Sequence, residues 1–126
     1  MRKIIAFINI FKRKKCIKTL LWLDDYRNPM ENDWLNFSPI GKDVEVVWVK
    51  SFDEFVDYLN KPIPLPDAIC FDHDLGEEKT GMDAAKYLVN LCNNLRLKLP
   101  EFNSQSSNPV GRENIMSYLE NYKKIR

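Results

Sequence analysis

This chain of 126 residues contains few histidines and cysteines, and its net charge is small. Its only histidine is His73, so acid–base chemistry by an imidazole must use that residue. The three cysteines, Cys16, Cys70 and Cys92, are odd in number and show no Cys-x-x-Cys spacing. With no recognisable secretory signal, we expect reduced thiols and a cytoplasmic location. The net charge of +1 gives no general attraction to nucleic acid, so any polyanion must be bound locally.

Long apolar runs are also missing. The first 16 residues place a short apolar stretch between basic clusters, but a membrane-spanning helix needs about 20 apolar residues. We therefore expect no membrane partner, and a solvated face is the simpler interpretation of Lys12–Lys15. We interpret residues 1–16 as a basic and apolar extension and residues 17–126 as one domain, because this length suits a single core.

Short apolar runs and helix-start signals alternate along the rest of the chain. Strands are predicted at residues 17–23, 44–50, 67–71 and 101–104, and helices after Ser51, Gly81 and Asn108. Ser51 and Glu54 have the spacing of a capping box, and Pro109 suits the first turn of a helix. Residues 26–33 are predicted to form a loop, because proline and asparagine interrupt the pattern. Strands alternating with helices predict an α/β fold with a parallel sheet of about four strands and no clear fifth strand.

Acidic residues follow two of the predicted strands. Asp24 and Asp25 come after the first, and Asp72 comes after the third. Because parallel strands end at the same edge of a sheet, these carboxylates should converge there. They predict a site for Mg²⁺, or Mn²⁺, together with a phosphate. Asp74 is a further candidate ligand, although it could instead cap the turn that follows.

His73, between Asp72 and Asp74, is a candidate catalytic acid, because neighbouring carboxylates favour its protonated form. Side chains alternate along a strand, however, so His73 could also point away from Asp72. The start of the last helix predicts an anion site on the same edge. Asn108 can cap the helix, Gly111 leaves room near its end, and Arg112 offers a charged fork.

These motifs resemble the response-regulator receiver fold, a flavodoxin-like three-layer sandwich. In that resemblance Asp24 and Asp25 match the acidic pair and Asp72 matches the acceptor aspartate, with Ser104 or Ser106 in place of the family's hydroxyl residue. Receivers also carry a phosphoryl-binding lysine after a fifth strand. This chain has no clear fifth strand, so phosphorelay signalling is not expected.

The chain is more similar to the receiver-derived cyclic-phosphate processing receiver domains. The motifs that carry this resemblance are Leu-Trp-Leu-Asp24-Asp25-Tyr-Arg27-Asn-Pro, Phe-Asp72-His73-Asp74-Leu-Gly76, Thr80-Gly81-Met-Asp83 and Ser106-Ser-Asn108-Pro109-Val-Gly111-Arg. The family usually has a histidine immediately before the serine of the last motif. This chain has Gln105, which cannot transfer a proton near neutral pH.

The resemblance implies a metal-dependent cyclic phosphoesterase, a hydrolase acting on a cyclic phosphate of RNA or a nucleotide, as in RNA repair. In this interpretation Asp24, Asp25 and Asp72 hold the metal, Asp72 is required for catalysis, and Arg27, Gln105, Ser106 and the helix end at Asn108 hold the phosphate. The alternative is a non-catalytic receiver-like binding or regulatory module, so we leave enzyme activity and oligomeric state open. A third interpretation takes Asp72 and Asp74 as the Asp-x-Asp motif of haloacid-dehalogenase-like phosphatases. We consider it weaker, because too little chain follows for the remaining motifs of that fold.

Overall fold

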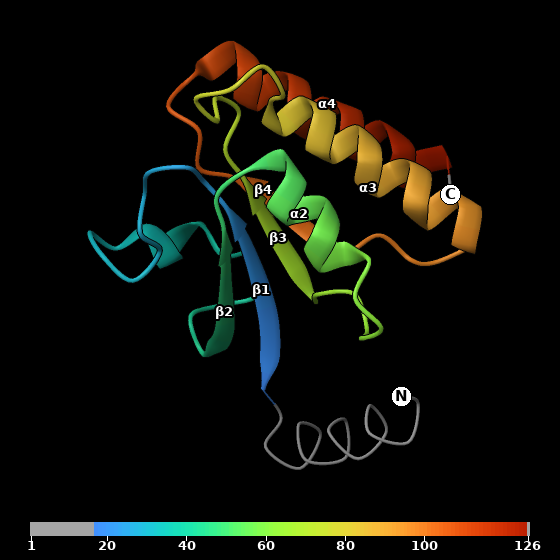
Figure 1. Ribbon diagram of the computed structural model, residues 1–126, viewed down its shortest axis with the longest axis horizontal. Helices are drawn as coiled ribbons and strands as arrows, with labels where there is room; N and C mark the ends of the chain where they lie inside the picture. Colours follow the sequence, from blue (N-terminus) through green and yellow to red (C-terminus); the bar gives the residue numbers. More distant parts are fainter. Residues whose placement is uncertain (1–16, 126) are drawn as a thin grey trace.

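Four parallel strands form the centre of the protein. The computed structural model describes residues 17–125, so the predicted extension at residues 1–16 lies outside the described part. The strands are β1 (Lys18–Leu23), β2 (Val44–Val49), β3 (Ala68–Phe71) and β4 (Glu101–Ser104), arranged in the order β2-β1-β3-β4 (Figure 1). This arrangement confirms the predicted α/β class, including the short and polar strand at residues 101–104.

The carboxyl ends of three strands are level with one another. Leu23 of β1 pairs with Phe71 of β3, and Phe71 pairs with Ser104 of β4. The pairing continues for one residue, because Asp72 N donates to Leu23 O and Gln105 N donates to Phe71 O. The residue after each strand is therefore held in line with its neighbours, which positions the site described below.

Three helices cover one face of the sheet. They are α2 (Phe52–Leu59), α3 (Gly81–Leu95) and α4 (Pro109–Ile125). Each begins at a polar cap: Ser51 Oγ accepts from Glu54 N, Thr80 and Asp83 form a capping box, and Asn108 Oδ1 accepts from Gly111 N. The main core lies beneath them and includes the fully buried side chains of β1 and β3, such as Leu21 and Phe71.

An irregular segment covers the opposite face. The loop predicted at residues 26–33 continues to residue 43 and contains only a short 3₁₀ helix, η1 (Trp34–Phe37), which the sequence pattern did not predict. Apolar side chains of this segment pack on Trp22 and Cys70, which are fully buried. Phe37 O accepts a hydrogen bond from Asn103 Nδ2 of β4 at 2.8 Å. The third layer of the sandwich is thus a loop anchored to the sheet and not a pair of long helices.

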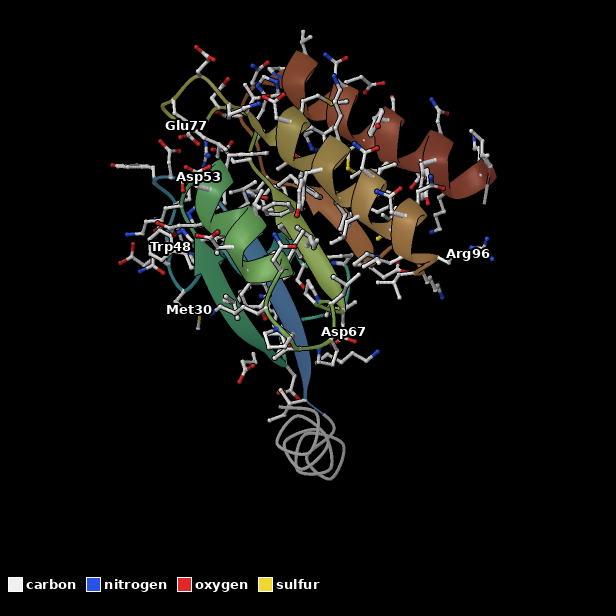
Figure 2. The ribbon with its side chains drawn as sticks, turned by 45° about the vertical axis from the view of Figure 1, so that its right-hand side comes forward. Met30, Trp48, Asp53, Asp67, Glu77 and Arg96 are labelled. Atoms are coloured by element: carbon white, nitrogen blue, oxygen red, sulfur yellow. The ribbon has the colours of Figure 1, made fainter. Side chains whose placement is uncertain are left out.

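The two ends of the sheet carry different connections. Asp67, just before β3, lies at the end opposite the loop that contains Glu77 (Figure 2). The loops after β1, β3 and β4 gather at the Glu77 end, where the acidic residues lie. Within residues 17–125, no helix is both long and apolar enough to cross a membrane.

Candidate functional site

Three carboxylates meet where β1 and β3 end. Asp24, Asp25 and Asp72 each offer an oxygen atom, and these atoms all lie within 4.8 Å of one another. Asp24 and Asp72 occupy equivalent positions one residue beyond paired strand ends, so both side chains leave the sheet on the same side. We call these three residues the acidic group. The structure confirms the predicted convergence, and the donor set is suitable for a hard cation such as Mg²⁺.

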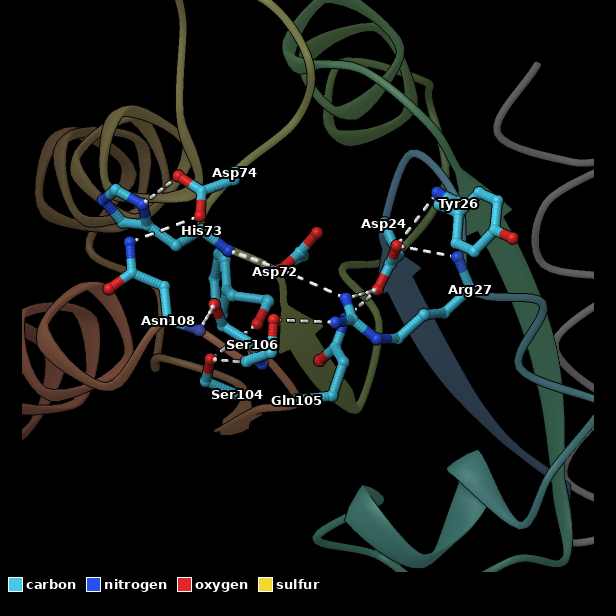
Figure 3. A network of polar contacts seen from close by, with 12 residues as sticks. Asp24, Tyr26, Arg27, Asp72, His73, Asp74, Ser104, Gln105, Ser106 and Asn108 are labelled. Atoms are coloured by element: carbon cyan, nitrogen blue, oxygen red, sulfur yellow. Dashed lines mark hydrogen bonds and ion pairs between the residues drawn. The ribbon is translucent and has the colours of Figure 1, made fainter.

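The two aspartates of the pair have different surroundings. Asp24 is fully buried, and its Oδ1 accepts hydrogen bonds from the backbone N–H groups of Tyr26 and Arg27 at 3.0 and 2.8 Å (Figure 3). These bonds form a turn that directs the chain away from the sheet after β1. Asp25 is exposed, and Gly76 of the β3–α3 loop lies against it, because a Cβ at Gly76 would be 3.0 Å from Asp25 Oδ2. Asp25 is therefore the more accessible carboxylate of the pair.

Asp72 is the carboxylate with the most strongly altered pKa. Burial, followed by the nearby charge of Asp24, raises its pKa from 3.8 to about 6. Arg27 and the hydrogen bond from His73 N act in the opposite direction but do not offset the burial. The acidic group without a cation is therefore electrostatically unfavourable at neutral pH.

Metal affinity should fall in acid, because a cation must displace the proton of Asp72. With a pKa of about 6, we expect the Mg²⁺ dissociation constant to rise roughly tenfold for each pH unit below that value. Calorimetric titration at pH 7.5 and pH 5.0 measures this change. Equal affinity at the two pH values would contradict the assignment of Asp72 as a ligand.

Arg27 places a positive charge beside the acidic group. Its Nη1 lies 3.2 Å from Asp24 Oδ2 and 3.5 Å from Asp72 Oδ1, and its Nη2 donates to Ser107 Oγ at 3.0 Å. The guanidinium carbon lies 5.1 Å from the centre of the Trp34 ring. Arg27 thus joins the acidic group to the loop after β4 and brings a positive charge beside it. Ser107 was not singled out from the sequence, since its contact with Arg27 spans 80 positions.

Gln105 lies beneath the acidic group. It is 2% exposed, and its Nε2 donates to Leu23 O at 2.9 Å and to Asp24 Oδ2 at 3.3 Å. Because both amide hydrogens are used, Gln105 has no donor left for a phosphate oxygen. The prediction that it binds phosphate does not fit this geometry, and its observed contacts instead hold Asp24 in place. Its Oε1 is buried and has no hydrogen-bond partner among residues 17–125.

His73 and Asp74 lie on the other side of β3. His73 Nδ1 is 2.9 Å from Asp74 Oδ1, and Asp74 Oδ2 accepts from Asn108 Nδ2 at 3.2 Å. Figure 3 shows this chain of contacts at the end of the site away from Asp24. The predicted metal role of Asp74 is not supported by this position, because its two oxygens face His73 and Asn108. Strand alternation likewise directs the His73 ring toward α4 and not into the acidic group, which argues against its predicted catalytic role.

The start of α4 differs from the predicted anion site. Gly111 does not open space for an anion: a Cβ there would overlap Cγ of the His73 ring, so the glycine allows the ring to pack against the helix. Arg112 Nε donates to Ser104 O at 3.0 Å and so fastens α4 to β4. Ser106 remains suitable for a phosphate, since its Oγ only accepts, from Asn108 N at 3.1 Å. Ser104 is not suitable for binding a phosphate, because it is fully buried and its hydroxyl donates to Phe71 O.

Replacing Gly111 by alanine should destabilise the protein, although alanine is normally the better residue in a helix. The added methyl group overlaps the His73 ring, and overpacking of this kind costs about 1–3 kcal/mol. Urea unfolding of Gly111→Ala measures the loss. In a protein that already carries His73→Ala, the Gly111→Ala change should cost less stability than it does in the wild type. Additive effects would show that the contact does not determine the requirement for glycine.

Comparison with known proteins agrees with the observed fold. The fold is shared with the bacteriophytochrome response regulator AtBRR, at 18% identity and a TM-score of 0.59 over 82% of this chain and 76% of that chain. It is also shared with the phosphorylated cyanobacterial phytochrome response regulator RcpA, at 20% identity and a TM-score of 0.50 over 86% and 91% of the two chains. No curated protein matches the sequence significantly.

The sheet order and the acidic group define the protein as a receiver-like α/β domain. The family model of the cyclic-phosphate processing receiver domain matches residues 19–121. The chain therefore belongs to that family, as the sequence motifs predicted.

Proposed function

We propose that this domain binds Mg²⁺ at Asp24, Asp25 and Asp72 and hydrolyses a cyclic phosphate on RNA or a nucleotide. The single observation that carries the proposal is the convergence of these three carboxylates at the sheet edge, within 4.8 Å of one another. The raised pKa of Asp72 supports it, because a cation would relieve the repulsion between the buried carboxylates. The family match supports a cyclic phosphate as the substrate class.

The residues around the acidic group suit a phosphate dianion or monoanion. Arg27 can neutralise its charge, and the hydroxyl groups of Ser106 and Ser107 can donate to its oxygens. When bound, the cation would act as a Lewis acid toward a phosphoryl oxygen and lower the pKa of a bound water. Asp24 is kept in position by its turn with Arg27 and by Gln105, which fixes the donor geometry before substrate arrives.

The departing oxygen of a cyclic phosphate must receive a proton when the ring opens. Gln105 cannot supply one near neutral pH, and the His73 ring packs on α4. We therefore expect slow turnover. The same observation favours the second candidate, a non-catalytic module that binds a cyclic phosphate without opening it.

Phosphorus NMR of a short RNA with a 2′,3′-cyclic phosphate end tests the proposal. Ring opening should require both the protein and Mg²⁺ or Mn²⁺, and it should stop when EDTA is added. The chemical shift of the product identifies which monoester forms. Asp57→Asn, a change at an exposed carboxylate on α2, is the matched control and should keep full activity. No ring opening with either metal would reject catalysis and favour the binding module.

A further inference from the structure

Exposed aromatic and apolar side chains flank one end of the site. Tyr26 immediately follows the acidic pair and is 86% exposed, and Met30 of the same loop is 69% exposed. The backbone of Tyr26 is fixed, because its N–H donates to Asp24 Oδ1 at 3.0 Å. The ring therefore projects into solvent from a rigid support beside the carboxylates.

The end of β2 adds to this aromatic side. Trp48 Nε1 donates to Asp24 O at 2.7 Å, which attaches the indole ring directly to the acidic pair. The exposed Lys50 lies over that ring, with its Nζ 4.3 Å from the ring centre. Figure 2 shows Trp48 and Met30 on the β2 side of the molecule, away from Arg96 at the end of α3.

The opposite end of the site is polar. Asp74 and Asn108 lie there and are bonded to each other, whereas Tyr26 lies at the far end beyond Asp24 (Figure 3). The site thus has a polar end, a central acidic group with Arg27, and an aromatic end. A nucleotide has matching parts, a phosphate and a flat aromatic base that are joined by the ribose.

We propose that the phenol ring of Tyr26 is the stacking platform for the base of the nucleotide whose cyclic phosphate lies at the acidic group. The inference rests on the proposed function and adds a specificity residue to it. An exposed ring next to the phosphate position can cover one face of any base, so it would select nucleotides over base-free sugar phosphates without selecting a sequence. Stacking of a base on an aromatic side chain contributes enough for about a tenfold effect on alanine substitution.

The test compares two substrates at saturating Mg²⁺: a nucleoside 2′,3′-cyclic phosphate and the 2′,3′-cyclic phosphate of methyl riboside, which has no base. Wild-type protein should prefer the nucleoside in kcat/KM. Tyr26→Ala should reduce this preference about tenfold, mainly through KM, and Tyr26→Phe should retain it because the ring remains. Val110→Ala, which removes exposed apolar surface on α4, is the matched control and should leave the preference unchanged.

The outcomes separate the inference from the proposed function. Turnover of both substrates with the same preference in wild type and Tyr26→Ala would overturn the role of Tyr26 and leave the phosphoesterase standing. No turnover of either substrate would reject the phosphoesterase. The dissociation constants of the same two compounds would then test the role of Tyr26. Weaker nucleoside binding by Tyr26→Ala alone would support the platform. Equal binding by both proteins, or no binding at all, would overturn it.

Discussion

Asp72→Asn should abolish metal-dependent turnover and, at the same time, make the metal-free protein more stable. Asparagine keeps the shape of the side chain and an oxygen for the hydrogen bond from His73 N, but it cannot be ionised. The acidic group loses one of its three carboxylates, so under the proposed function we expect Mg²⁺ binding to weaken about a hundredfold or more and ring opening to become undetectable.

The gain in stability follows from the raised pKa of Asp72. The folded protein binds the Asp72 proton more tightly than the unfolded chain, since the pKa is about 6 in place of 3.8. This contribution to stability is fully present below about pH 4 and is lost as the pH rises through 6. The difference corresponds to about 3 kcal/mol at neutral pH. Asparagine avoids the loss, so the variant should be more stable than wild type at pH 7.5.

Urea unfolding in EDTA measures the free energy of unfolding at pH 7.5, where Asp72 is ionised, and at pH 4.0, where it is protonated. The advantage of Asp72→Asn should be present at the higher pH and nearly absent at the lower. Added Mg²⁺ should stabilise the wild type and leave the variant unchanged. A variant that is less stable than wild type at pH 7.5 would contradict the proposed origin of the raised pKa. A variant that still binds Mg²⁺ tightly would contradict the role of Asp72 as a metal ligand.

Gln105→His should increase turnover about a hundredfold. It restores the histidine that this family usually has at that position, and a positioned general acid or base commonly contributes 10²–10⁴-fold. The imidazole would replace an amide that already reaches Leu23 O and Asp24 Oδ2. One ring nitrogen could keep a contact of this kind, and the charge of Asp24 would favour the protonated ring.

Ring-opening rates between pH 5 and pH 9 test this prediction. The ring-opening rate of Gln105→His should have a maximum near neutral pH. The rate of the wild type should show no pH dependence that comes from residue 105. Gln105→Met, which keeps the volume but removes every hydrogen bond, is the control and should lower activity, because Asp24 loses its support. Unchanged turnover in a folded Gln105→His protein that binds Mg²⁺ normally would show that proton transfer does not limit the rate.

Strand and helix positions could be predicted because their signals are local. The run before Asp24 and the Ser51 and Asn108 caps occupy contiguous residues, and the structure confirms each element near the expected bounds. The convergence of Asp24 and Asp72 also followed, since parallel strands share an edge. The cover of the second face was missed, because η1 and its loop are held by contacts with Cys70 and Asn103 that no local pattern reveals.

The sequence by itself determined the family, the α/β class and the acidic group, because these depend on residue type and spacing along the chain. The tertiary structure decided which neighbouring polar residues belong to that group. In that structure His73 and Asp74 face α4, and both amide hydrogens of Gln105 are bonded beneath Asp24. The imidazole ring of His73 occupies the space at Gly111. The physical reason is that strand alternation left two directions open for a residue such as His73, and packing between elements distant in the sequence selected one of them.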